Sequence, residues 1–189
     1  MSYKHLFAKN YQNTIKSMVR VNFAGELGAI KIYKSQIKVI PENKHLKEML
    51  DSEIAHFEYF RKISQKLFVP QTIFLPIWQR LASFMGFITA KSSFADAMLC
   101  TEAVESVIEK HYQEQILQIE DILQYHNNTD EFIIENKEVV QELLAKIKIF
   151  MQEEIEHKNT GNENSTMKII PFTLIKAVTK LAVILSQRI

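Results

Sequence analysis

Residues 26–40 read ELGAIKIYKSQIKVI, and residues 105–119 read ESVIEKHYQEQILQI. Each stretch begins with a glutamate and has a tyrosine seven positions later, a glutamine ten positions later and an isoleucine fourteen positions later. These intervals place all four side chains on one stripe of an α-helix. The sequence therefore predicts two long helices of the same design, each with a glutamate, Glu26 or Glu105, on the stripe that faces the core.

Two further helical stretches share a second motif, Glu-x-x-His. In both, apolar residues stand four and seven positions before the glutamate, so the glutamate and the histidine also lie on an apolar stripe. The chain thus contains two helical hairpins of one pattern, written twice. We expect an all-α, antiparallel four-helix bundle with helices over about residues 13–40, 43–68, 93–125 and 130–158.

Two additional segments lie outside these four helices. An apolar insert, residues 70–92, follows the second helix. A C-terminal helix is expected over residues 167–188, after the polar stretch 159–166, which is expected to end the fourth helix. We expect residues 1–189 to form a single domain.

The composition excludes several classes of protein. A formal net charge of +1 over 189 residues gives no hint of a nucleic-acid partner, and the single cysteine, Cys100, permits neither an internal disulfide nor a CxxC metal site. The most apolar stretch, residues 67–90, contains Arg80, and no membrane-spanning helix is expected. The N-terminal residues lack the features of a signal or transit peptide, which favours a bacterial cytoplasmic-side protein or a processed organellar one.

Four glutamates on buried helix stripes need positive charge nearby. An unpaired buried carboxylate costs on the order of several kcal/mol, and no lysine or arginine occupies the stripe positions. Two divalent cations would balance the four negative charges and leave the histidines neutral, as nitrogen donors. One glutamate from each of two helices, with Glu-x-x-His from each of the other two, is the di-iron or di-manganese site of ferritin-like bundles. The predicted metal ligands are Glu26, Glu53, His56, Glu105, Glu154 and His157.

The Glu-x-x-His motif alone is a weak signal, because roughly half an occurrence is expected by chance in a chain of this composition. A third copy, Glu42 to His45, follows Pro41 and is interpreted as a helix start. Glu153 and Glu156, beside the last copy, are interpreted as solvated charges or as partners of the ligands. The alternative for the six predicted ligands is that they are solvated charged residues whose spacing matches the helical period by chance.

Other residues near the predicted site have two interpretations each. Tyr112 and His111 are candidates for a catalytic role, and the alternative is a core tyrosine beside a surface or ligand-supporting histidine. Gly25 and Gly28 remove side-chain bulk around Glu26, which would let dioxygen or a substrate approach the metals. A helix packed for stability alone would carry alanine or leucine there, since glycine costs about 1 kcal/mol in a helix interior.

Four motifs together resemble one known family. The motifs are RVNFAGELGAIKIY, DSEIAHFEYF, TEAVESVIEKHYQEQI and QEEIEHKNT. From about residue 15 onward the chain resembles the demethoxyubiquinone hydroxylases, the di-iron monooxygenases of late ubiquinone biosynthesis. The resemblance implies iron ligands at the same six positions. The family usually has Asp-His where this chain has Asn22 and Phe23, and a tyrosine where it has Leu27; none of these is a metal ligand, so the site is expected to be retained.

The resemblance also implies a function. It implies a monooxygenase that uses dioxygen, two iron ions per chain and an external reductant such as NADH to hydroxylate a polyprenylated methoxy-benzoquinol, demethoxyubiquinol. Because this substrate lies in the bilayer, the insert 70–92 is expected to contact the membrane surface; the alternative is a buried or oligomer-forming helix.

The expected location is the cytoplasmic face of a bacterial inner membrane, as a peripheral membrane protein, with a lipid-presenting protein or a second copy of the chain as partner. Three other functions would suit parts of the same pattern. They are a ferritin-like iron store, a manganese catalase or rubrerythrin-like peroxidase, and a metal-free lipid-binding bundle.

Overall fold

The structure, a computed structural model, describes residues 11–125, 130–165 and 172–188. Within these residues it contains seven helices and no strand, which confirms the prediction of an all-α protein. The helices are α1 (Tyr11–Val39), α2 (Lys44–Lys66), α3 (Leu75–Ser92), α4 (Phe94–Tyr125), α5 (Glu131–Glu135), α6 (Lys137–Asn164) and α7 (Phe172–Arg188). The expected start of the C-terminal helix, at residue 167, lies outside the described residues.

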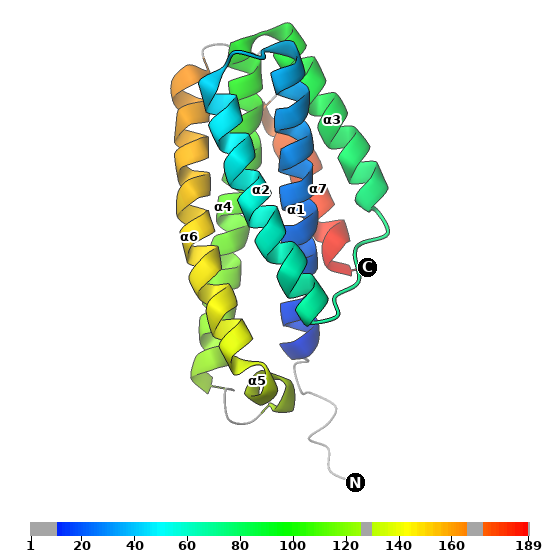
Figure 1. Cartoon of the computed structure of the whole chain (residues 1–189), viewed down its shortest axis with the longest axis vertical. Helices are drawn as coiled ribbons and strands as arrows, with labels where there is room; N and C mark the ends of the chain where they lie inside the picture. The colour runs from blue at the N-terminus through cyan, green and yellow to red at the C-terminus, as the bar shows by residue number, and fades with distance from the viewer. Residues whose placement is uncertain (1–10, 126–129, 166–171, 189) are drawn as a thin grey trace.

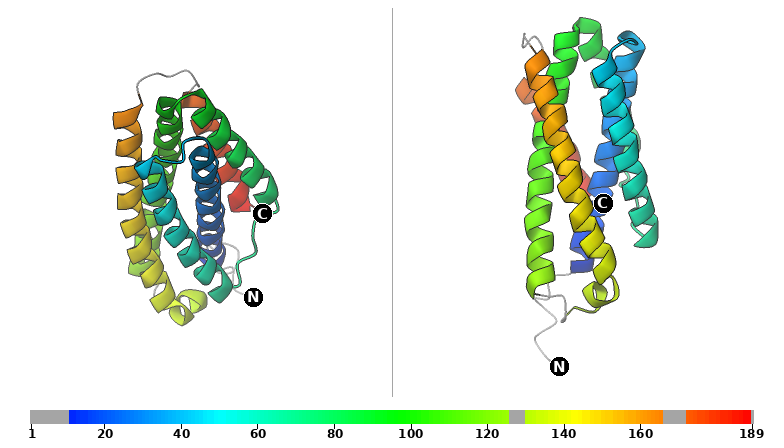
Figure 2. Two further views of the ribbon diagram at one scale, coloured as in Figure 1. Left: turned by 45° about the horizontal axis from the view of Figure 1, so that its top comes forward. Right: turned by 60° about the vertical axis from the view of Figure 1, so that its left-hand side comes forward.

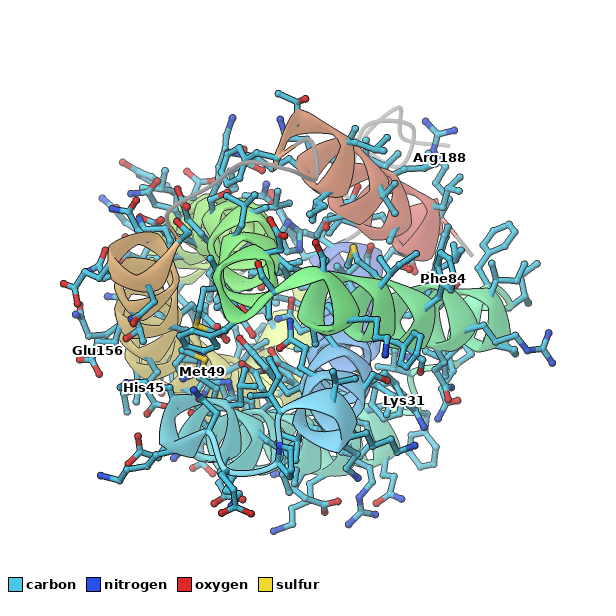
Figure 3. The ribbon with its side chains drawn as sticks, turned by 90° about the horizontal axis from the view of Figure 1, so that it is seen from above. Lys31, His45, Met49, Phe84, Glu156 and Arg188 are labelled. Atoms are coloured by element: carbon cyan, nitrogen blue, oxygen red, sulfur yellow. The ribbon has the colours of Figure 1, made fainter. Side chains whose placement is uncertain are left out.

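Four long helices, α1, α2, α4 and α6, form the body of the molecule (Figure 1). α1 and α2 run in opposite directions as one pair, α4 and α6 as the other, and the second view in Figure 2 shows the two pairs side by side. α3 and α7 pack against α1 and α4 on the side away from α2 and α6, as seen from above in Figure 3. The arrangement is a pair of hairpins with an additional layer on one face.

The sequence carries signals for the helix ends. The side-chain oxygen of Asn43 accepts a hydrogen bond from the backbone N–H of Leu46 at 3.0 Å and so caps α2. Asp130 caps α5 in the same way, through the N–H of Ile133 at 3.1 Å. Pro76 lies in the first turn of α3, where a missing N–H removes no intrahelical bond.

The apolar stripes of the long helices meet in the core. Side chains from all four helices are completely buried there, among them Ile15, Leu46, Ile119 and Leu143. The burial of each such side chain is worth roughly 1.5–3 kcal/mol. Because the predicted metal ligands lie on these same stripes, the packing that stabilises the bundle also turns the ligands inward.

The structure differs from the expected fourth helix, residues 130–158, at both of its ends. The short helix α5 is separated from α6 at Asn136, and α6 continues to Asn164 instead of ending near residue 158. Gly161 explains the extension. A Cβ atom there would lie 2.8 Å from backbone atoms of Met98 and Glu102, so the glycine lets α6 lie directly against α4.

The outer face of α3 is largely apolar, with Arg80 as an exposed charge. Ile77, Leu81, Phe84, Phe87 and Ile88 are exposed, and Phe84 points away from the bundle in Figure 3. Among the described residues, no helix combines the length and the hydropathy that a membrane crossing requires.

Candidate metal centre

The four long helices bring the six predicted ligands together inside the bundle. They are Glu26 on α1, Glu53 and His56 on α2, Glu105 on α4, and Glu154 and His157 on α6. Five of these side chains are 1–3% exposed, and the sixth, His157, is 12% exposed. Residues far apart in the sequence thus form one buried polar cluster in an apolar core.

The cluster consists of two overlapping groups, each able to hold a metal ion. One group is Glu26, Glu53, His56 and Glu154, and the other is Glu53, Glu105, Glu154 and His157; in each, one ligand atom per residue lies within 4.8 Å of the others. Glu53 and Glu154 belong to both groups. Because a carboxylate has two oxygens, each of these two glutamates could bridge a pair of ions.

The donor atoms face one another. Nδ1 of His56 lies 3.4 Å from an oxygen of Glu26 and 3.2 Å from an oxygen of Glu154. Nδ1 of His157 lies 3.2 Å from Glu53 and 3.4 Å from Glu154. Both nitrogens, with one oxygen of Glu53 and one of Glu154, are buried without a hydrogen-bond partner among the described residues. A buried polar atom without a partner costs about 1–3 kcal/mol, so this converging set fits bound cations.

The crowding of carboxyl groups shifts their pKa values. Burial raises the pKa of Glu53 and of Glu105 well above the usual value, and the nearby charge of Glu154 raises both further. In the absence of cations this shift favours the protonated form of both carboxyl groups, and a bound metal would favour the ionised form. Carboxylate oxygens with imidazole nitrogens form a donor set that suits iron and manganese.

Two tyrosines support the glutamates in a crosswise arrangement. The hydroxyl of Tyr33 on α1 donates to Glu105 on α4 at 2.8 Å, and the hydroxyl of Tyr112 on α4 donates to Glu26 on α1. Burial raises the pKa of both tyrosines well above the usual value, so both keep their proton. The repeated spacing of glutamate and tyrosine therefore has a structural meaning, because each tyrosine orients the glutamate of the other repeat.

His111 lies outside both metal groups and belongs to a buried polar chain. Its Nε2 lies 2.7 Å from the side-chain nitrogen of Gln115, and Gln115 and Asn22 exchange two hydrogen bonds of 2.8 Å. Burial lowers the pKa of His111 to about 4, so the ring is neutral near pH 7 and accepts a bond from the amide. His111 also lines a polar cavity of about 380 Å³ between α1, α4 and α7.

Glu153 makes a contact that the sequence predicted only as one of two alternatives. Its Oε2 lies 2.7 Å from Nε2 of His56 and accepts a hydrogen bond of 2.8 Å from the hydroxyl of Ser52. Glu153 is therefore a partner of a predicted ligand. His45, the end of the third Glu-x-x-His copy, lies outside both metal groups.

An all-α bundle with a buried cluster of glutamates and histidines defines the class of protein: a helical bundle whose core can hold metal. Comparison with known proteins then identifies the family. The family model described as "Ubiquinone biosynthesis protein COQ7" matches residues 13–186. The chain belongs to this family, the demethoxyubiquinone hydroxylases, which confirms the resemblance seen in its motifs.

Curated relatives match most of the chain. It is 33% identical over 188 residues to the 5-demethoxyubiquinone hydroxylase, mitochondrial, of Saccharomyces cerevisiae, which covers 91% of this chain and 77% of the yeast protein. It is 31% identical over 172 residues to the NADPH-dependent 3-demethoxyubiquinone 3-hydroxylase, mitochondrial, of Caenorhabditis elegans, with 89% and 85% covered. It is also 31% identical over 183 residues to the 3-demethoxyubiquinol 3-hydroxylase of Rhodospirillum rubrum, with 93% and 78% covered.

Proposed function

We propose that this chain is a demethoxyubiquinol hydroxylase, an O2-dependent monooxygenase of ubiquinone biosynthesis. One observation carries the proposal: a chain of the COQ7 family buries two overlapping ligand groups that share Glu53 and Glu154. In the reaction, one oxygen atom of O2 enters a ring C–H bond of a polyprenylated methoxy-benzoquinol. The other oxygen atom leaves as water, with two electrons and two protons supplied from outside.

Two iron ions per chain fit this centre. Each ion would have one glutamate and one histidine of its own and would share Glu53 and Glu154 with the other. When bound, the iron pair supplies the redox chemistry that activates dioxygen. For the electrons we propose an external nicotinamide nucleotide, NADH or NADPH, because several relatives are named NADPH-dependent. A ferritin-like store and a manganese catalase are not favoured, because the relatives bear the names of hydroxylases.

The proposed site for the quinol is an apolar cavity behind Glu26. It lies between α1, α3, α4 and α7, and Gly25 and Gly28 form part of its wall. A Cβ atom at Gly28 would meet no atom within 4 Å, and one at Gly25 would come no closer than 3.9 Å to Ile108. The two glycines therefore leave open space on the side of α1 next to a predicted iron ligand, which supports the sequence-based hypothesis for them.

Trp78 adds one polar group to this apolar cavity. Its indole N–H is buried without a hydrogen-bond partner among the described residues, and its ring lines the cavity. A buried donor of this kind stabilises a ligand that brings an acceptor oxygen. The carbonyl, hydroxyl and methoxy oxygens of the quinol ring are such acceptors, so we propose that Trp78 donates to the head group.

We propose that the outer faces of α3 and α7 contact the membrane surface. Phe84 on α3 and Leu181 on α7 are exposed, and Lys180 and Arg188 on α7 can meet anionic head groups. Leu81 is exposed on this face and also lines the apolar cavity, so a polyprenyl tail could pass from the bilayer to the site. The proposed location is the cytoplasmic face of a bacterial inner membrane, and a lipid-presenting protein or a second copy of the chain is the alternative occupant of this face.

The test of the function is turnover by the iron-loaded protein. With NADH, a short-tailed demethoxyquinol and isotopically labelled dioxygen, the product should carry one labelled oxygen. Glu105→Ala and His157→Ala should abolish the product and lower the iron content below two per chain. Glu142→Gln, an exposed carboxylate on the same helix as His157, should change neither. Full iron content and normal turnover in both ligand variants would show that the assigned site is wrong.

A further inference from the structure

The two proposed metal positions have different surroundings although a repeat builds both. This inference rests on the di-iron site proposed above. His56 is held on two sides: its Nε2 faces Oε2 of Glu153 at 2.7 Å, and its ring lies 4.0 Å, centroid to centroid, from the ring of Phe150. The hydroxyl of Ser52 donates to the same oxygen of Glu153 and fixes that carboxylate in turn.

His157 has no equivalent support. Glu153 directly precedes the motif glutamate on α6, and the residue in the same place on α2 is Ser52. The Ser52 hydroxyl bonds to Glu153, and no described residue hydrogen-bonds to Nε2 of His157. The repeat is therefore broken at the single position that would have given both histidines a carboxylate partner.

His157 instead borders a polar cavity of about 420 Å³ between α2 and α6. The cavity is lined by carboxylates, imidazoles, small polar groups and one methionine. No lysine or arginine is among the lining residues, which are His45, Glu48, Met49, Ser52, Glu153, Glu156, His157 and Thr160. Lys44 pairs with Glu48 at 3.1 Å, but the Lys44 side chain is 85% exposed and is not among the residues that line the cavity. Figure 3 shows His45, Met49 and Glu156 at the end of the bundle where α2 and α6 lie side by side.

Two buried carboxylate oxygens without a hydrogen-bond partner among the described residues lie close to His157. The unpartnered oxygens of Glu53 and Glu154, both in side chains that are 1% exposed, lie 3.2 and 3.4 Å from its Nδ1. In the other group, Glu26, Glu53, His56 and Glu154, every side chain is at most 3% exposed, and none of these four residues lines the α2–α6 cavity. His157 is the one predicted ligand that lines this cavity, so a cation entering through it would meet His157 before any other predicted ligand.

We infer that the two positions hold iron unequally: Glu153 positions His56 and retains the iron at the Glu26 side, while the iron at the Glu105–His157 side exchanges through the α2–α6 cavity. A carboxylate on the remote nitrogen fixes the orientation of a metal-binding imidazole and makes it a stronger donor. Loss of such a partner typically lowers metal affinity by about 10–100-fold.

Mössbauer spectroscopy of the 57Fe-loaded protein separates the two positions. Glu153→Gln should alter the signal of one iron, lower the affinity there by about 10–100-fold and leave the other signal unchanged. The matched control Glu142→Gln should alter neither. A change in both signals, or in neither, would overturn the positioning role. If Glu153→Gln does not fold, as judged by helical content, Ser52→Ala should cause a smaller change in the signal of one iron only.

Isotope exchange then tests the entrance. Protein loaded with 56Fe is mixed with excess ferrous 57Fe, and the first 57Fe signal should be the one that Glu153→Gln leaves unchanged. Entry at equal rates, or first into the other position, would refute the inference. His45→Ala with Glu156→Gln should slow the exchange severalfold at unchanged iron content, and an unchanged rate would exclude the cavity as the route. A chain that binds no iron at all would instead refute the proposed function.

Discussion

Gly28 offers a direct test of the apolar cavity, because a larger side chain there should stabilise the helix but take space from the cavity. A Cβ atom there would meet nothing within 4 Å, so alanine fits without a clash. Alanine stabilises a helix interior by about 0.5–1 kcal/mol over glycine, in part because it restricts the unfolded chain. For a chain of this size, a gain of that order raises Tm by up to roughly 2–4 °C. We expect Gly28→Ala to be more stable than the wild-type protein.

Activity should change in the opposite direction. Gly28 lines the cavity proposed for the quinol, so every added carbon takes space from the substrate. We expect Gly28→Ala to lower kcat/KM only slightly. Gly28→Leu should lower it by at least about tenfold, which corresponds to roughly 1.4 kcal/mol of transition-state stabilisation. Both variants should still bind two irons per chain, because Gly28 is not one of the ligands.

Gly86→Ala is the matched control for the expected effect of Gly28→Ala on stability. A Cβ atom at Gly86 would clash with the backbone of Ile32, so Gly86→Ala must push α3 away from α1 and should destabilise the protein by about 1–3 kcal/mol. The measurements are thermal unfolding and steady-state kinetics with a demethoxyquinol. If Gly28→Leu folds, binds iron and turns over the quinol as fast as wild type, the cavity is not the quinol site.

Three further predictions concern the site and its surroundings. In the metal-free protein, burial and then the charge of Glu154 raise the pKa of Glu53 and Glu105, so their contribution to stability is present below the usual glutamate pKa and is lost as the pH rises. Thermal unfolding in a chelator should therefore show a Tm that falls from about pH 5 toward neutrality, and added iron should remove this fall; a flat profile would contradict the shifts. Tyr33→Phe and Tyr112→Phe each delete one crosswise hydrogen bond, so both should lower Tm similarly, while a catalytic role for Tyr112 requires a larger loss of kcat in its variant alone. Trp78 is the only tryptophan, so a bound quinone should quench nearly all tryptophan fluorescence, and Trp78→Phe should weaken quinone binding several-fold in calorimetry without affecting a polyprenyl alcohol.

Helical periodicity was sufficient to predict which side chains face inward. The positions of Glu26 and Glu105 at equal distances from Tyr33 and Tyr112 are a property of single helices, and single helices have a known period. The prediction of an all-α fold follows from the same period. The six predicted ligands lie together because four stripes of this kind can bury themselves only against one another.

Helical periodicity does not predict features that depend on how two helices approach each other. The sharing of Glu53 and Glu154 between two groups follows from the positions of α2 and α6 across the core, which the spacing along one helix does not describe. The sequence places Gly161 in a polar stretch that predicts a helix end, but in the structure Gly161 is a point of close contact with α4. Glu153 is one of several acids near the motif, and only the position of α2 shows that it bonds to His56.

The departure at Asn22 shows why hydrogen-bond geometry and charge must be considered separately near this centre. Asn22 is 3% exposed, and it both donates to and accepts from Gln115, so the pair satisfies its own polar groups. The second N–H of Gln115 then bonds to the neutral His111. An ionised aspartate at position 22 could accept from Gln115 but could not donate, and it would place a further buried charge one helical turn from Glu26. Asparagine therefore keeps the hydrogen-bonded connection from His111 to α1 without adding a charge to this buried polar chain.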